Sequence, residues 1–205
     1  MKTIKHIAIV SAIAILSLIA TSAQAQYSEY EVKAAYIFNF AKFIEWPEKY
    51  IGDTINLCIY KNDPFGIILE KTMIGRKANN RAWKISRVNN ISEIGDCHIL
   101  LISDLKQHEI MQVLKSIERK PIVTIGDEIP NFCHIGGIFN FMPQFSKHQF
   151  EINKDAADNI DIKISPKLLL LAKIISTKEK LFCIFSTTII WLSSYNIFSF
   201  IYSTC

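Results

Sequence analysis

Ser103 and Lys106 have the Ser-x-x-Lys spacing with which penicillin-binding enzymes activate a serine nucleophile for acyl transfer. The companion motifs of those enzymes, Lys-Thr-Gly and Ser-Asp-Asn, are absent from the sequence. A serine between an apolar run and a helical period is also typical of a helix cap. The sequence therefore favours a cap over a nucleophile at Ser103.

Asp155, Asp158 and Asp161 are spaced closely enough to suggest oxygen ligands for a hard cation such as Ca²⁺. Asp155 precedes two alanines as a helix cap does, so a solvated acidic turn is favoured over a metal site. The histidines outside the N-terminal segment show no ligand spacing: His98, His108, His134 and His148. Phosphate-binding glycine motifs, a nucleophile elbow and a zinc-protease motif are also absent. We therefore expect no enzyme activity, no metal and no cofactor.

One short stretch could instead bind a small molecule. The sequence "KNDPFG" follows an apolar run, and Asn62, Asp63 and Phe65 could line a crevice at the carboxyl ends of parallel strands. The same residues are also those of an ordinary turn, and turn formation is the simpler explanation.

Both ends of the chain differ from its middle. Residues 1–25 have a basic start, an apolar run and a small-x-small site, which predicts a signal peptide cleaved after Ala25. Residues 26–180 suit one domain with one core. Residues 181–205 form a hydrophobic tail with no charged side chain. Three roles stay open for this tail: attachment to a membrane, burial in the fold or a partner, and an extension without a role.

Charge and cysteine content narrow the function further. The net charge of +4 falls to +2 without Lys2 and Lys5, and no basic stripe with interleaved aromatics occurs, so nucleic acid is not expected as a partner. In an oxidising compartment the cysteines tend to pair, and Cys58 and Cys97 are the best pair by position because both lie in strand-like apolar runs. Cys133 is expected to stay unpaired, and the states of Cys183 and Cys205 are left open.

Short apolar runs alternate with amphipathic runs in the middle of the chain, which is typical of an α/β sheet with crossover helices. Strands are predicted over residues 54–60, 82–88, 97–103, 121–127, 136–142 and 148–153. Helices are predicted over residues 65–72 and 107–117, and a last one from Ser165-Pro166 to Ile175. The expected fold class is a single-domain, three-layer α/β/α sandwich with a mostly parallel sheet.

The first helix, within "EYEVKAAYIFNFAKFIEWPE", is apolar on most of its circumference. One stripe is expected to be buried: Val32, Ala35, Tyr36, Asn39, Phe40 and Phe43. A second apolar stripe lies beside it: Ala34, Ile37, Phe38, Ala41 and Ile44. Enclosure of most of this helix by its own domain is favoured, with Tyr30, Phe43 and Trp46 as candidates for an interface.

Six segments in order resemble the YfiR-like family of periplasmic proteins over roughly residues 30–176: "VKAAYIFNFAKFIEWP", "LCIYKNDPFG", "CHILLIS", "PIVTIGD", "GGIFNF" and "FEINKDAADNIDIKISPKLLLLAKII". The resemblance implies an α/β sandwich, a homodimer, regulation without catalysis and a disulfide at Cys58 and Cys97. A second family disulfide is expected to be absent, because its region contains only Cys133. The tail after Ile175 has no counterpart in the family pattern.

The resemblance also implies a function. The chain would repress an inner-membrane diguanylate cyclase of the YfiN type, lowering cyclic di-GMP and biofilm formation, and an outer-membrane lipoprotein of the YfiB type would relieve it. The alternative is a periplasmic small-molecule sensor. We expect the partner surface on the end of the first helix and on an exposed late strand with its following turn, at Phe43, Glu45, Trp46, Glu151, Asn153, Asp155 and Lys163.

Overall fold

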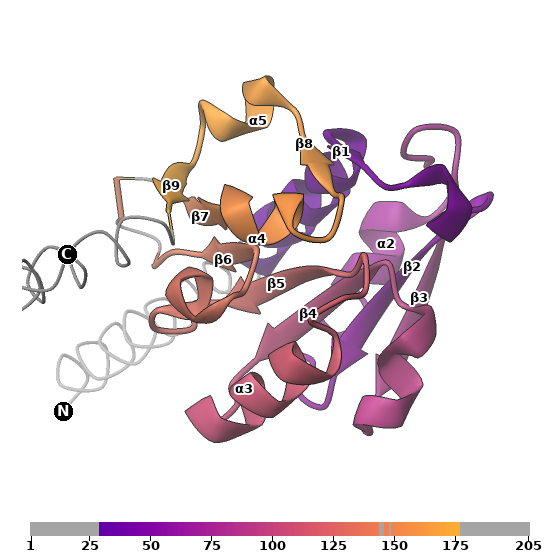
Figure 1. Cartoon of the computed structure of the whole chain (residues 1–205). Coiled ribbons are helices and arrows are strands. Elements are labelled where there is room, and N and C mark those ends of the chain that lie inside the picture. The colour runs from indigo at the N-terminus through magenta and orange to yellow at the C-terminus, as the bar shows by residue number, and fades with distance from the viewer. Residues whose placement is uncertain (1–28, 144–145, 148, 177–205) are drawn as a thin grey trace, which may run out of the picture.

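The structure is a computed structural model and describes residues 29–143, 146–147 and 149–176. Its main feature is a sheet of seven strands in the order β3-β2-β4-β5-β6-β7-β9 (Figure 1). Neighbouring strands run parallel except for β6 and β7. The strands are β2 (Thr54–Tyr60), β3 (Ala82–Val88), β4 (Ile99–Ser103), β5 (Val123–Asp127), β6 (Phe139–Phe141), β7 (Phe150–Asn153) and β9 (Lys173–Ile175).

Helices cover both faces of this sheet, which confirms the expected α/β sandwich. The helix over residues 29–42 and α2 (Ile68–Met73) pack on one face, and α3 (Gln107–Ser116) packs on the other. Strand β4 joins the two cores because its side chains alternate: Ile99 and Leu101 point to the first face, Leu100 and Ile102 to the second. The strand is buried on both sides, as a central parallel strand should be.

The remaining elements are short. They are β1 (Ile44–Glu45), β8 (Lys163–Ile164), α4 (Lys154–Asp158), α5 (Pro166–Leu169) and the 3₁₀ turns η1 (Glu48–Tyr50), η2 (Ile91–Asp96) and η3 (Phe132–Ile135). Among the described residues, no helix is long and apolar enough to cross a membrane. The predicted cleavage after Ala25, the 181–205 tail, Cys183 and Cys205 lie outside the described residues.

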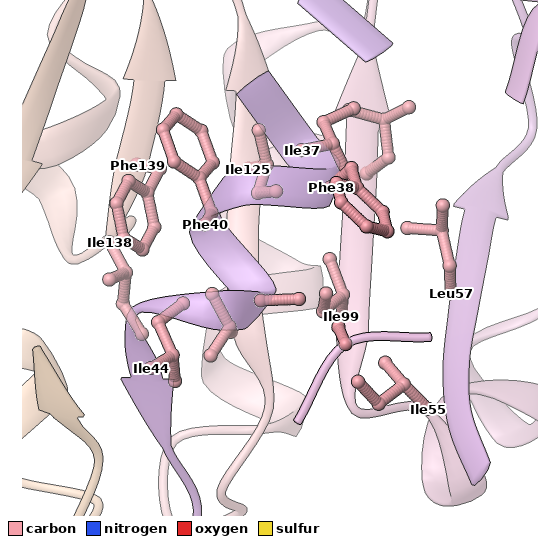
Figure 2. Packing of buried hydrophobic residues seen from close by; sticks show 14 of the residues in the cluster. Ile37, Phe38, Phe40, Ile44, Ile55, Leu57, Ile99, Ile125, Ile138 and Phe139 are labelled. Atoms are coloured by element: carbon pink, nitrogen blue, oxygen red, sulfur yellow. The ribbon is translucent and has the colours of Figure 1, made fainter. Parts of the chain in front are cut away.

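The first helix is enclosed on one side only, less than expected, because Asn39 and Lys42 are exposed and Tyr36 and Phe43 are half-buried. The buried stripe is also the other one. Ala34, Ile37 and Phe38 are buried, together with Ala41 and Ile44, whereas Val32 is half exposed. Phe40 is the only member of the expected stripe that is buried, and it is buried completely. Its ring stacks on Phe139 with centroids 4.6 Å apart (Figure 2). Hydrophobic periodicity alone therefore identified the wrong apolar face of this helix as the one that packs on the sheet.

The predicted last helix is wrong for most of its length. It ends after one turn at Leu169, and Lys173–Ile175 instead form β9 parallel to β7. Ser165 and Pro166 do start α5, with the proline in the first turn as predicted, but the Ser165 side chain makes no capping hydrogen bond. The chain then joins the open side of β7, where Ile174 lies opposite Ile152, so tertiary pairing overrides the helical period.

Candidate functional site

Two distant segments of the expected partner surface meet in one small sheet. Strand β1 pairs with β8 in antiparallel orientation, with Ile44 opposite Ile164 and Glu45 opposite Lys163 (Figure 1). The Ser165 N–H donates to the Phe43 carbonyl at 2.9 Å and closes the pair. Glu45 and Lys163 are exposed, and Phe43 is half-buried. We call Phe43–Glu45 with Lys163–Ser165 the β1–β8 ribbon.

Three other expected contact residues are not on the surface. Trp46 is only 8% exposed and packs edge-to-face with His98, ring centroids 6.4 Å apart. Glu151 is 5% exposed, and its carboxylate accepts from Lys173 Nζ at 2.8 Å. Asn153 is fully buried. The expectation of an exposed late strand is therefore wrong, because β9 turns β7 into an interior strand of the sheet.

The Asn153 side chain has a local structural role. Its amide oxygen accepts from the Ala156 N–H at 2.9 Å and caps α4, and its amide nitrogen donates to the Cys133 carbonyl at 2.7 Å. The cap is thus Asn153 and not Asp155, which lies half-buried in the first turn of α4 and accepts from the Ser176 hydroxyl at 3.1 Å. Of the expected contact residues, the structure brings Phe43, Glu45 and Lys163 together.

The structure joins Cys58 and Cys97 in a disulfide, with the two Cα atoms 5.8 Å apart. Cys58 lies on β2, and Cys97 lies two residues before the parallel neighbour β4. His98 also links these two segments through hydrogen bonds to Asn56. The His98 backbone N–H donates to the Asn56 carbonyl, and the ring Nδ1 of His98 accepts from the Asn56 backbone N–H at 3.0 Å. Cys133 is a buried free thiol, and burial raises its pKa, so it should be unreactive.

A crevice of about 770 Å³ opens at the carboxyl ends of the parallel strands. It lies where strands β2, β4 and β5 end, the usual place for a ligand in such a sheet. Asn62 and Asp63 line it, as the small-molecule alternative expected, but Phe65 is buried against the Tyr30 ring. Asp63 also builds the turn, because its Oδ1 accepts from the Phe65 and Gly66 N–H groups at 2.9 and 3.0 Å.

A buried lysine at one wall of the crevice was missed by sequence reasoning. Lys33 Nζ lies 2.7 Å from Glu29 Oε1, 2.7 Å from Asp127 Oδ1 and 2.8 Å from Glu128 Oε1. Burial alone would lower the pKa of Lys33, but the hydrogen bonds to these three carboxylates outweigh it and raise the pKa. The Glu29 pKa is lowered, chiefly by its hydrogen bond from Lys33.

The sequence carries only a faint signal of this cluster. Lys33 interrupts the apolar helix face one turn after Glu29, Asp127 ends a buried strand, and Glu128 follows it. Helix geometry explains the first pair, since i and i+4 side chains are neighbours. The other two contacts span 94 and 95 residues, so only the fold brings them together.

Comparison with models of protein families identifies the family of this chain. The family model described as YfiR/HmsC-like matches residues 30–173, which is more than half of the chain. The chain belongs to the YfiR/HmsC-like family. This is a regulatory family of periplasmic proteins. No curated protein matches the chain.

Proposed function

We propose that this protein is a periplasmic, non-catalytic regulator that binds an inner-membrane diguanylate cyclase of the YfiN type and holds it inactive. The observation that carries the proposal is the YfiR/HmsC-like match over residues 30–173, because that family is associated with control of diguanylate cyclases. Repression would lower cyclic di-GMP and so reduce biofilm formation.

The disulfide supports a periplasmic location. Bridges of this kind persist in oxidising compartments and are rare where thiols are kept reduced. The Cys58–Cys97 bridge lies in the core, where both residues are buried, and is compatible with folding after export. We propose that residues 1–25 direct this export and are removed after Ala25.

Repression is a matter of differential affinity. The regulator can shift the cyclase toward its inactive state only by the difference between its affinities for the two states. A hundredfold preference corresponds to about 2.7 kcal/mol, which is enough to change the active fraction of a balanced enzyme from one half to about one hundredth. A lipoprotein of the YfiB type would relieve repression by competing for the regulator, and the regulator itself would act as a homodimer.

The β1–β8 ribbon is the surface that we propose for contact with the cyclase. Its two strands are too short to be stable alone, so they are held by the packing of Ile44 and Ile164 on the core. That packing leaves Glu45 and Lys163 exposed as a pair of opposite charges. Such a pair can give binding specificity for a partner surface with the complementary charges.

Charge exchange across the ribbon separates partner contact from fold stability. In Glu45→Lys two like charges would lie opposite each other, which costs about 0.2–1 kcal/mol. The double variant Glu45→Lys/Lys163→Glu restores opposite charges and therefore the stability, but it reverses the pattern presented to a partner. Glu31→Lys is the matched control, because Glu31 is exposed on the first helix outside the ribbon.

The assay is retention of membrane proteins on the purified mature chain, followed by mass spectrometry. Wild type and Glu31→Lys should retain an inner-membrane protein with a diguanylate cyclase domain, and the double variant should lose it while melting at the wild-type temperature. Equal retention by the folded double variant would exclude the ribbon as the contact, and failure of wild type to retain any cyclase would count against the function.

A further inference from the structure

The crevice at the carboxyl ends of β2, β4 and β5 carries an excess of negative charge. Its lining contains five carboxylates, which are Glu29, Asp63, Asp104, Asp127 and Glu128, and a single ammonium group, that of Lys33. Asp63 has an ion pair of 2.8 Å with Arg87, which also pairs with Glu70 outside the lining at 2.7 Å. The other four carboxylates and Lys33 leave three formal negative charges unmatched within the lining.

The carboxylates that contact Lys33 keep oxygen lone pairs that can accept further hydrogen bonds. It approaches one oxygen of each of three carboxylates, namely Glu29, Asp127 and Glu128. An ionised carboxylate has about four lone-pair positions on two oxygens, so each of these groups can accept further hydrogen bonds. Among the described residues, the second Asp127 oxygen has only a long contact, 3.5 Å, with the Tyr30 hydroxyl.

Ser103 provides an independent sign of a missing partner. It ends β4 directly opposite Asp127 in the register of the sheet and lines the same crevice. The residue is 3% exposed, and its hydroxyl has no hydrogen-bond partner among the described residues. Leaving a buried hydroxyl unpaired costs about 1–3 kcal/mol, so its place beside a crevice indicates an acceptor or donor from outside the fold.

We propose that this crevice binds a small aliphatic polyamine. A primary ammonium group carries three N–H donors, which match the free oxygens of Asp127 and Glu128 and the Ser103 hydroxyl. A second ammonium group on the same ligand balances the remaining carboxylates of the lining. The volume of about 770 Å³ is ample for such a ligand.

Two other cation types fit less well. A quaternary ammonium group needs aromatic faces, but the Tyr30 ring is already occupied by Lys33, 5.1 Å from the ring centroid. A metal ion needs converging ligands, and the described part of the chain contains no group of three or more suitable side chains.

Spermidine is the probe, and isothermal titration calorimetry of the purified full-length mature protein is the measurement. We expect saturable binding with one spermidine per chain that weakens with added salt. Ser103→Ala should weaken it at least about tenfold, because a hydrogen bond to a charged group is lost. This variant should melt no lower than wild type, since the hydroxyl has no internal partner to lose.

Glu128→Gln should also weaken spermidine binding by about tenfold, and Glu31→Gln, on the same helix as Lys33 but outside the crevice, should not change it. Four results would overturn the proposal: no binding of spermidine, unchanged affinity in Ser103→Ala, an equal loss in Glu31→Gln, or equally tight binding of Mg²⁺ at the same ionic strength. The titration contains no cyclase, so its result tests spermidine binding independently of the proposed repression of a cyclase.

Discussion

Removing the Cys58–Cys97 disulfide should destabilise the protein without changing its fold. The two cysteines are 39 residues apart, and the chain-entropy relation for a loop of that length gives about 4 kcal/mol. Alanine is the right replacement because both sites are buried, where a serine hydroxyl would need a partner. The hydrogen bonds between His98 and Asn56 remain, so β2 and β4 should still pair.

Urea unfolding of the mature protein, followed by far-ultraviolet circular dichroism, measures this loss. Cys58→Ala/Cys97→Ala should lose about 4 kcal/mol and melt about 10 °C lower for a domain of this size. Dithiothreitol should lower the stability of wild type by a similar amount and leave the double variant unchanged. Cys133→Ala is the control: it removes a buried thiol outside the bridge, so sensitivity to dithiothreitol should persist.

A loss below about 1 kcal/mol, or an equal effect of dithiothreitol on wild type and on the double variant, would refute this account of the bridge.

Three further substitutions test the core and the buried charges. Lys33→Met should cost about 3 kcal/mol near neutral pH by leaving its carboxylates without a counter-ion. Folding lowers the Glu29 pKa, so the stabilisation by the ionised Glu29 carboxylate is present above its unfolded pKa and is lost as pH falls through its folded pKa. The urea midpoints of wild type and Lys33→Met should therefore converge below about pH 4. A constant gap between the two midpoints would contradict this. Phe40→Ala should lose about 3–5 kcal/mol in urea titrations, against about 0.5 kcal/mol or less for Val32→Ala on the exposed side of the same helix. Glu151→Lys should lose more than about 3 kcal/mol because it buries a cation without a counter-ion next to the exposed Lys173 ammonium group, and a variant with the wild-type melting temperature would show that this carboxylate is not buried as described.

Local sequence signals located the first strands well. Strands β2 and β3 have the bounds predicted from "TINLCIY" and "AWKISRV", because continuous or alternating apolar runs bounded by turn residues leave little choice. Asp63 likewise forms the turn that its type predicts. The outline of a mostly parallel sheet with crossover helices follows from that alternation of elements.

The C-terminal part could not be predicted in the same way, because it depends on pairing between distant segments. Whether Glu151 is exposed is decided by β9, and "KLLLLAKII" has a helical period that hides this strand. The β1–β8 ribbon has only two residues per strand and leaves no periodic signal, although Glu45 and Lys163 were both expected at a partner surface. Lys33 was visible only as a charge that interrupts an apolar helix, since two of its partners lie more than 90 residues away.

Cellular cyclic di-GMP in a strain that lacks this gene tests the central claim most directly. If the protein restrains a diguanylate cyclase from the periplasm, deletion should raise cyclic di-GMP and biofilm formation, and the exported wild-type protein should restore both. The rise should disappear when the cyclase retained by the purified protein is deleted as well. An unchanged cyclic di-GMP level, in a strain that demonstrably produces the protein before deletion, would contradict the account.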